Sequence, residues 1–244
     1  MIDYKETEYS GKESILFIHG LGASRWMWWQ QDAAFTDYHV ITVDLPGHGK
    51  SVSTPWISLA DTTDFIAQHV IKDRVVHVVG ISLGGNVALE LAKHYPEKVL
   101  SAFISGITVK PMPFKFLLKV QSLVVQRGIR NTRYLNKLAR EFYSLPQDKL
   151  SEFVNNYQLL TRETYETIGK EIMKFRLDES YGAIIKPCLI VAGDNESSGI
   201  IESIDIAPKF IPHAKGRLIP GAQHVWPVQE PYQFNRILRD WFIE

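Results

Sequence analysis

Cysteine, net charge and long apolar runs are all scarce in this sequence, and each scarcity excludes a class of protein. Cys188 is the single cysteine among 244 residues, which excludes an internal disulfide framework and favours a reducing compartment. Basic and acidic residues both number 27, so the overall charge gives no reason to expect a nucleic-acid partner. No apolar run approaches the roughly 18 residues of a membrane-spanning helix. The composition therefore predicts a cytoplasmic protein without stable membrane insertion.

Short apolar runs alternate with helical patterns through most of the chain. The runs lie at residues 15–18, 39–43, 75–80, 99–104, 188–193 and 216–220. This alternation predicts an α/β fold with a mostly parallel sheet and helices on both of its faces. Residues 2–9 are expected to add an edge strand antiparallel to residues 15–18. Pro231 lies in the first turn of a predicted closing amphipathic helix.

The middle of the chain has a different pattern. Between residues 110 and 181 we find helical patches and no convincing strand. We interpret residues 1–109 and 182–244 as one core domain, interrupted by a helical cap over residues 110–181. The apolar patch at residues 113–126 fits a cap helix packed on the core better than a helix lying on a membrane surface.

A serine stands at the junction between the predicted strand at residues 75–80 and a helical pattern that begins at Leu83. In the stretch GISLGG, Ser82 is flanked by Gly80 and Gly84. A strand before Gly-x-Ser-x-Gly and a helix after it are the context of a nucleophile elbow, where the serine is strained and flanking side chains would clash. Such a turn displays the hydroxyl at the carboxyl end of a central strand, where open α/β sheets bind ligands. Ser82 is therefore predicted to be a nucleophile.

A second glycine-flanked turn, FIHGLGAS at residues 17–24, follows the first apolar run. It can bring the N–H of Leu21 close to the point faced by the N–H of Leu83, at the start of the helix after Ser82. Two N–H donors that converge on one oxygen form an oxyanion hole. Taken alone, the turn fits a plain strand-to-helix connection equally well.

Together, five stretches resemble the α/β-hydrolase fold family in their order and spacing. They are HGLG at residues 19–22, DLPGHGKS at 44–51, GISLGG at 80–85, IVAGDNES at 190–197 and PGAQHVW at 220–226. The resemblance covers the predicted core and not the insertion. It implies a serine esterase or lipase-like protein with a helical cap and a Ser-His-acid triad. It also implies that His19 and His48 brace loops.

The base implied by the resemblance is His224, in the loop between the last strand and the closing helix. The family's chain order of nucleophile, acid and histidine suits this position. The acid commonly follows a glycine by three residues, and Glu196 occupies that slot after Gly193. Asp194, one residue after the glycine, is the rival. We favour Glu196 as the residue that orients the histidine.

Tryptophans gather near these motifs, at Trp26, Trp28, Trp29 and Trp226. Trp226 follows His224 by two residues and is expected to wall the site. Trp28 and Trp29 point to different helix faces, so at least one of them belongs to the core. The cluster suggests a pocket for an apolar acyl or alcohol group.

A serine nucleophile predicts acyl transfer to water, with a carboxylic ester as the most economical small-molecule substrate. A lactone, a thioester, an N-terminal prolyl amide or a carbon–carbon bond next to a ketone could use the same residues. Lyases of the menaquinone pathway resemble the chain too, but usually carry a basic residue where Asn86 stands. A slow-turnover ligand receptor of the same fold is the alternative from another class. We expect no metal and no cofactor, because neither a metal-ligand spacing nor a phosphate loop occurs, and a monomer or homodimer.

Overall fold

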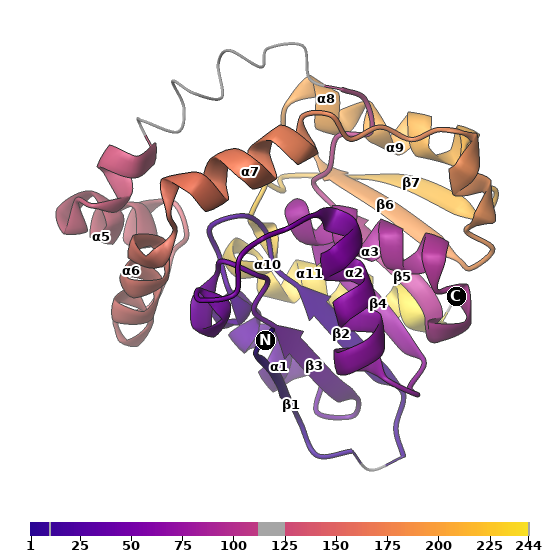
Figure 1. Cartoon of the computed structure of the whole chain (residues 1–244), viewed down its shortest axis with the longest axis horizontal. Coiled ribbons are helices and arrows are strands. Elements are labelled where there is room, and N and C mark those ends of the chain that lie inside the picture. The colour runs from indigo at the N-terminus through magenta and orange to yellow at the C-terminus, as the bar shows by residue number, and fades with distance from the viewer. Residues whose placement is uncertain (10, 112–124, 244) are drawn as a thin grey trace.

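The computed structural model describes residues 1–9, 11–111 and 125–243, and its strands form a seven-stranded sheet in the order β1-β3-β2-β4-β5-β6-β7 (Figure 1). The strands are β1 Tyr4–Glu6, β2 Ser14–Ile18, β3 His39–Val43, β4 Val76–Ile81, β5 Val99–Ser105, β6 Cys188–Gly193 and β7 Ala214–Ile219. Neighbouring strands are parallel, except that β1 is antiparallel to β3. The predicted α/β fold is confirmed.

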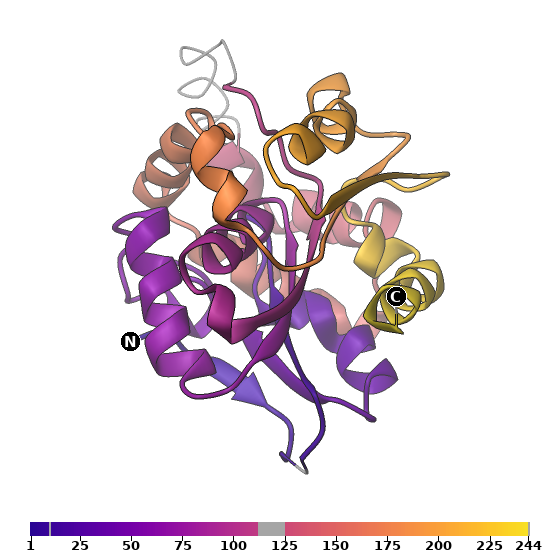
Figure 2. The same ribbon diagram turned by 90° about the vertical axis from the view of Figure 1, so that its right-hand side faces the viewer.

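Helices cover both faces of the sheet because its central strands are apolar on both faces. Leu16 and Ile18 of β2 join one buried cluster with α2 (Leu59–Phe65) and α3 (Leu83–His94), whereas Ile15 and Phe17 join a second cluster with α11 (Pro231–Ile243). Successive side chains of a strand point to opposite faces of the sheet, and this alternation places the two pairs of residues in different clusters. Figure 2 shows the purple helices α2 and α3 on one side of the sheet and the yellow α11 on the other.

The prediction that residues 2–9 pair with residues 15–18 was wrong. β1 pairs instead with β3, with Tyr4 opposite Val43. The reason is that β2 lies between β3 and β4, so both of its edges are already hydrogen-bonded. At this end of the sheet, the outer edge of β3 is the one left open to an additional strand.

The helical region predicted between β5 and β6 contains α5 Thr132–Glu141, α6 Leu150–Leu159 and α7 Arg162–Ile172. Figure 1 shows these helices on one side of the sheet. Asn131 and Thr161 cap α5 and α7, since their side chains accept the N–H groups of Tyr134 and Thr164. Nearly all of the helix expected at residues 113–126 lies outside the described residues, and the boundaries of the cap stay a prediction.

Four shorter helices complete the described elements that matter for the site. They are α1 Trp29–Ala34, α8 Ser198–Ile201, α9 Ser203–Ile206 and α10 Trp226–Gln229. α1 follows a single 3-10 turn at Arg25–Trp28. In the described ranges, no helix is long and apolar enough to cross a membrane.

Candidate active site

Ser82 occupies a strained turn between β4 and α3. Its φ of 55° and ψ of −121° lie in a region that side chains rarely adopt. Neither flanking glycine could carry a side chain, because a Cβ on Gly80 would lie 2.1 Å from the carbonyl oxygen of Gly84, and one on Gly84 would lie 2.2 Å from that of Ile18. The turn is therefore closely packed, and strain of this kind is a feature of functional sites.

The HGLG turn approaches Ser82 from the neighbouring strand β2. A Cβ on Gly20 would lie 3.3 Å from the Cβ of Ser82 and 3.9 Å from its Oγ. Leu21 and Ser82 line the same cavity. Leu83 is the first residue of α3, where a backbone N–H has no partner inside the helix. The two predicted oxyanion donors thus belong to turns that meet beside the serine.

Two buried histidines brace the loops around this turn, as the resemblance implied. His19 accepts the N–H of Leu45 at Nε2, at 2.9 Å, and Nδ1 of His48 lies 2.9 Å from the carbonyl oxygen of Pro46. Burial lowers the pKa of His19 to about 4 and that of His48 to about 3. Both rings are therefore neutral near pH 7 and hold the backbone by hydrogen bonds.

His224 lies in the turn between β7 and α10, and its Nδ1 is 2.6 Å from Oε1 of Glu196. The other carboxylate oxygen, Oε2, accepts the N–H of Gly193 at 2.8 Å. The Glu196 side chain is 1% exposed and that of His224 is 40% exposed. A buried carboxylate held at both oxygens can fix the orientation and tautomer of an imidazole.

Gly106, directly after β5, makes room for this pair. Its φ is +68°, and a Cβ there would lie 3.0 Å from the His224 ring and 3.1 Å from Oε1 of Glu196. No motif in the sequence marks this glycine. Both its backbone conformation and the space beside it disfavour a side chain.

Asp194, the rival acid, contacts a different group. Its Oδ1 accepts the N–H of Gly221 at 2.8 Å, and the residue is exposed. This bond ties the loop after β6 to the turn after β7. Of the two candidate acids, Glu196 is the one that the structure brings to His224.

The sequence matches a known family. The sequence model of the "Alpha/beta hydrolase family" matches residues 15–237. The chain belongs to this family. An "AB hydrolase superfamily protein" of Gibberella zeae is 28% identical over 96% of this chain and 81% of its own length. A monoacylglycerol lipase of Bos taurus is 23% identical over 94% of this chain and 75% of its own.

Solved structures agree on the fold. A hydrolase of Pseudomonas aeruginosa superposes with a TM-score of 0.80 over 99% of this chain and 94% of that one, at 20% identity. Going by its distant relatives, this α/β-hydrolase is a hydrolase of the esterase or lipase type.

Ser82 and His224 open into one small cavity of the α/β-hydrolase core and cap, with a volume of about 60 Å³. Apolar side chains dominate its lining, and two tyrosines of the cap complete it. The lining residues are Gly20, Leu21, Ala23, Trp26, Met27, Ile81, Ser82, Tyr143, Tyr157, His224 and Val225. Tyr143 and Tyr157 were missed from the sequence, because no motif marks the cap.

Trp226 does not form the pocket wall that was expected of it. Its indole is fully buried, donates its N–H to the Ser105 hydroxyl at 2.9 Å and packs on Phe234 at a ring distance of 4.8 Å. Trp226 starts the short helix α10 and turns into the core beneath His224. Trp28 is also fully buried, in line with the expectation that one of the Trp28–Trp29 pair belongs to the core.

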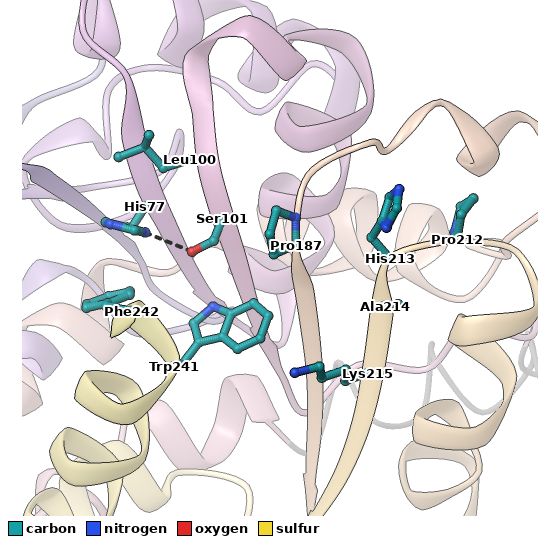
Figure 3. A pocket seen from close by; sticks show the side chains of 10 residues that line it. All are labelled: His77, Leu100, Ser101, Pro187, Pro212, His213, Ala214, Lys215, Trp241 and Phe242. Atoms are coloured by element: carbon teal, nitrogen blue, oxygen red, sulfur yellow. Dashed lines mark hydrogen bonds between the residues drawn. The ribbon is translucent and has the colours of Figure 1, made fainter. Parts of the chain in front are cut away.

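A larger cavity, of about 540 Å³, lies at the opposite end of the sheet. Figure 3 shows His77, Ser101, Trp241 and Lys215 among its lining residues, with the 2.8 Å contact between His77 Nδ1 and the Ser101 hydroxyl. His77 precedes Ser82 by five residues along β4, which is roughly 16 Å at 3.3 Å per residue. This cavity is therefore separate from the one beside the serine and belongs to the amino ends of the strands.

Within the described ranges, no group of three or more His, Cys, Asp or Glu side chains could hold a metal ion. Cys188 is buried in β6, and burial raises the pKa of its thiol to about 12. A thiol in that state is a packing group and a poor nucleophile.

Proposed function

We propose that this α/β-hydrolase is a serine hydrolase that cleaves a small carboxylic ester through an acyl-enzyme at Ser82. The observation that carries the proposal is that a strained serine and a histidine oriented by a buried carboxylate face one cavity. Ser82 is the nucleophile, His224 the general base and Glu196 the orienting acid. Leu21 and Leu83 supply the oxyanion N–H groups.

In the first half of the reaction, Oγ of Ser82 attacks the ester carbonyl carbon while Nε2 of His224 takes its proton. Glu196 accepts the Nδ1–H of His224, so Nε2 is left as the acceptor and the imidazolium that forms is stabilised. The N–H groups of Leu21 and Leu83 donate to the oxygen on which negative charge develops. His224 then protonates the departing alcohol, and the acyl group stays on Ser82.

In the second half, water replaces the alcohol. His224 takes a proton from the water as it attacks the acyl carbon, and Ser82 regains its proton when the carboxylic acid is released. The apolar lining from Trp26, Met27 and Ile81 favours an uncharged substrate group, because a charge buried there would be left without a partner. The relatives that are named as a lipase and as a methyl ester esterase support the ester as the substrate.

Labelling and turnover test the proposal together. A fluorophosphonate probe should label the wild-type protein and leave a folded Ser82→Ala variant unlabelled. The wild type should hydrolyse p-nitrophenyl acetate and butyrate, and Ser82→Ala should not. Labelling at Ser82 without turnover would instead favour a slow ligand receptor of the same fold, and no labelling of the folded wild type would reject both functions.

A further inference from the structure

Two tyrosines of the cap add polar side chains to the cavity that Ser82 and His224 line. Tyr143, just after α5, and Tyr157, on α6, both line the cavity beside Ser82. Their hydroxyl oxygens lie 2.6 Å apart, which is a hydrogen bond. Hydroxyl groups in an apolar environment are costly unless they are paired, and these two pair with each other.

The pair is held rigidly against the catalytic turns. Phe153 packs against both rings, with ring distances of 4.9 Å to Tyr143 and 4.6 Å to Tyr157. A Cβ on Gly22 would lie 3.3 Å from Cε1 of Tyr157, so this ring lies over the HGLG turn that contains Leu21. The cap thus fixes the two hydroxyls relative to the oxyanion donors of the core.

One hydroxyl proton of the pair is left over. Two phenols contribute two O–H donors, and the bond between Tyr143 and Tyr157 uses one of them. In the described part of the chain, neither hydroxyl donates to another acceptor. Burial raises the pKa of both phenols, so both keep their protons well above neutral pH. The cavity therefore contains a neutral donor that a bound molecule can use.

Trp26 is another side chain that lines the same cavity. The indole N–H of Trp26 is buried and has no hydrogen-bond partner within the described ranges. Trp26 and Tyr143 are neighbours, with ring centres 6.2 Å apart. Among the described residues that line the cavity, none is a lysine or an arginine, so the tyrosine donor is not matched to a carboxylate or phosphate.

We propose that the substrate carries a second, uncharged oxygen acceptor on the short chain that enters this cavity, and that the Tyr143–Tyr157 pair binds this oxygen. An ether, a ketone, a hydroxyl or a second ester would fit. The chain is short because a cavity of about 60 Å³ holds roughly four to six water-sized spheres. The inference rests on the proposed function and adds the class of ester.

Isosteric substrate pairs test the inference. On the acyl side, p-nitrophenyl methoxyacetate differs from p-nitrophenyl butyrate by one oxygen in place of a methylene. On the alcohol side, 2-methoxyethyl acetate differs from butyl acetate in the same way. For each pair, the ratio of kcat/KM values, oxygen substrate over carbon substrate, is measured in wild type, Tyr143→Phe, Tyr157→Phe and the double variant.

For the substrate pair whose oxygen contacts the tyrosines, this kcat/KM ratio should fall about 3- to 10-fold in the Phe variants, as expected for the loss of one neutral hydrogen bond. Comparing ratios between variants cancels the intrinsic reactivity of each ester and any loss of folded protein. Tyr165→Phe is the matched control, because Tyr165 is a half-buried cap tyrosine outside the cavity lining, and its ratios should equal those of the wild type.

Unchanged ratios for both pairs in an active enzyme would overturn the inference and leave the pair a purely structural contact of the cap. The same outcome would leave the proposed function intact, because wild-type turnover that depends on Ser82 is measured in the same assay. Conversely, a folded wild type that hydrolyses none of the four esters would reject the proposed function itself, and this inference with it.

Discussion

Replacing Glu196 with glutamine changes one atom of the proposed triad and should nearly abolish turnover. The carboxylate is 2.6 Å from Nδ1 of His224 and also holds the N–H of Gly193. The carbonyl oxygen of the glutamine can still accept from Gly193, which turns its NH₂ group toward Nδ1. The imidazole then carries its proton on Nε2, so it can no longer accept the proton of Ser82.

The magnitude follows from the role of an orienting acid. Loss of such a carboxylate lowers kcat by about 10³- to 10⁴-fold, or about 4 to 5.4 kcal/mol at 1.36 kcal/mol per tenfold. We expect KM for p-nitrophenyl butyrate to change little, because Glu196 is not among the residues that line the cavity. Steady-state kinetics of purified variants with matched thermal unfolding profiles measures both parameters.

Asp194→Asn is the matched control, since it makes the same chemical change two residues away. Its side-chain oxygen can keep the bond to the N–H of Gly221, which Asp194 accepts at 2.8 Å. Activity should stay close to that of the wild type. If Asp194→Asn is instead the inactive variant and Glu196→Gln is near normal, the assignment of the acid is refuted.

Two further predictions concern stability. Gly84→Ala should destabilise the fold by about 3 kcal/mol or more, because the new Cβ would lie 2.2 Å from the Ile18 carbonyl oxygen. Gly199→Ala is the control, because Gly199 is exposed and its new Cβ would lie 3.6 Å from Thr108, an ordinary contact distance. Equal urea midpoints for the two variants would contradict the packing argument. Because burial lowers the pKa of His19 to about 4 and of His48 to about 3 from 6.5, the unfolded chain binds more protons below pH 6.5. Stability should then fall as the pH drops from 6.5 toward 4, by up to about 1.4 kcal/mol per pH unit for each histidine. Urea unfolding at pH 7 and pH 5 measures this, and equal stability at both would show that the rings are not buried neutral.

The strand positions and the turn at Ser82 could be predicted from the local sequence, because interactions within the same short segment determine them. Cys188–Gly193 was predicted with the observed bounds, and β4 was displaced by one residue to Val76–Ile81. Apolar runs of this length between glycines leave few alternatives to a buried strand. The glycines beside Ser82 are required by contacts within one strand, one turn and one helix.

Contacts between segments that are far apart in the sequence were harder to predict. The pairing of β1 with β3 depends on which edge of the sheet remains open. Trp226 follows His224 closely in sequence, yet its indole turns to Ser105 of β5. Tyr143 and Tyr157 line the cavity beside Ser82 because the helical region between β5 and β6 packs against the core. The roles of Ser82, His224 and Glu196 stay predictions until the variants are measured.

By itself, the sequence determined the α/β class, the serine turn and the loop that carries His224, because residues that follow parallel strands meet at one edge of a sheet. The spacing after Gly193 favoured Glu196 and left Asp194 as a rival, and the tertiary structure decided which carboxylate meets the histidine. Asp194 and Glu196 are two residues apart in one loop, and the backbone path after β6 sends the first to Gly221 and the second to His224. A hydrogen bond of this kind depends on where two loops from different strands are placed in space.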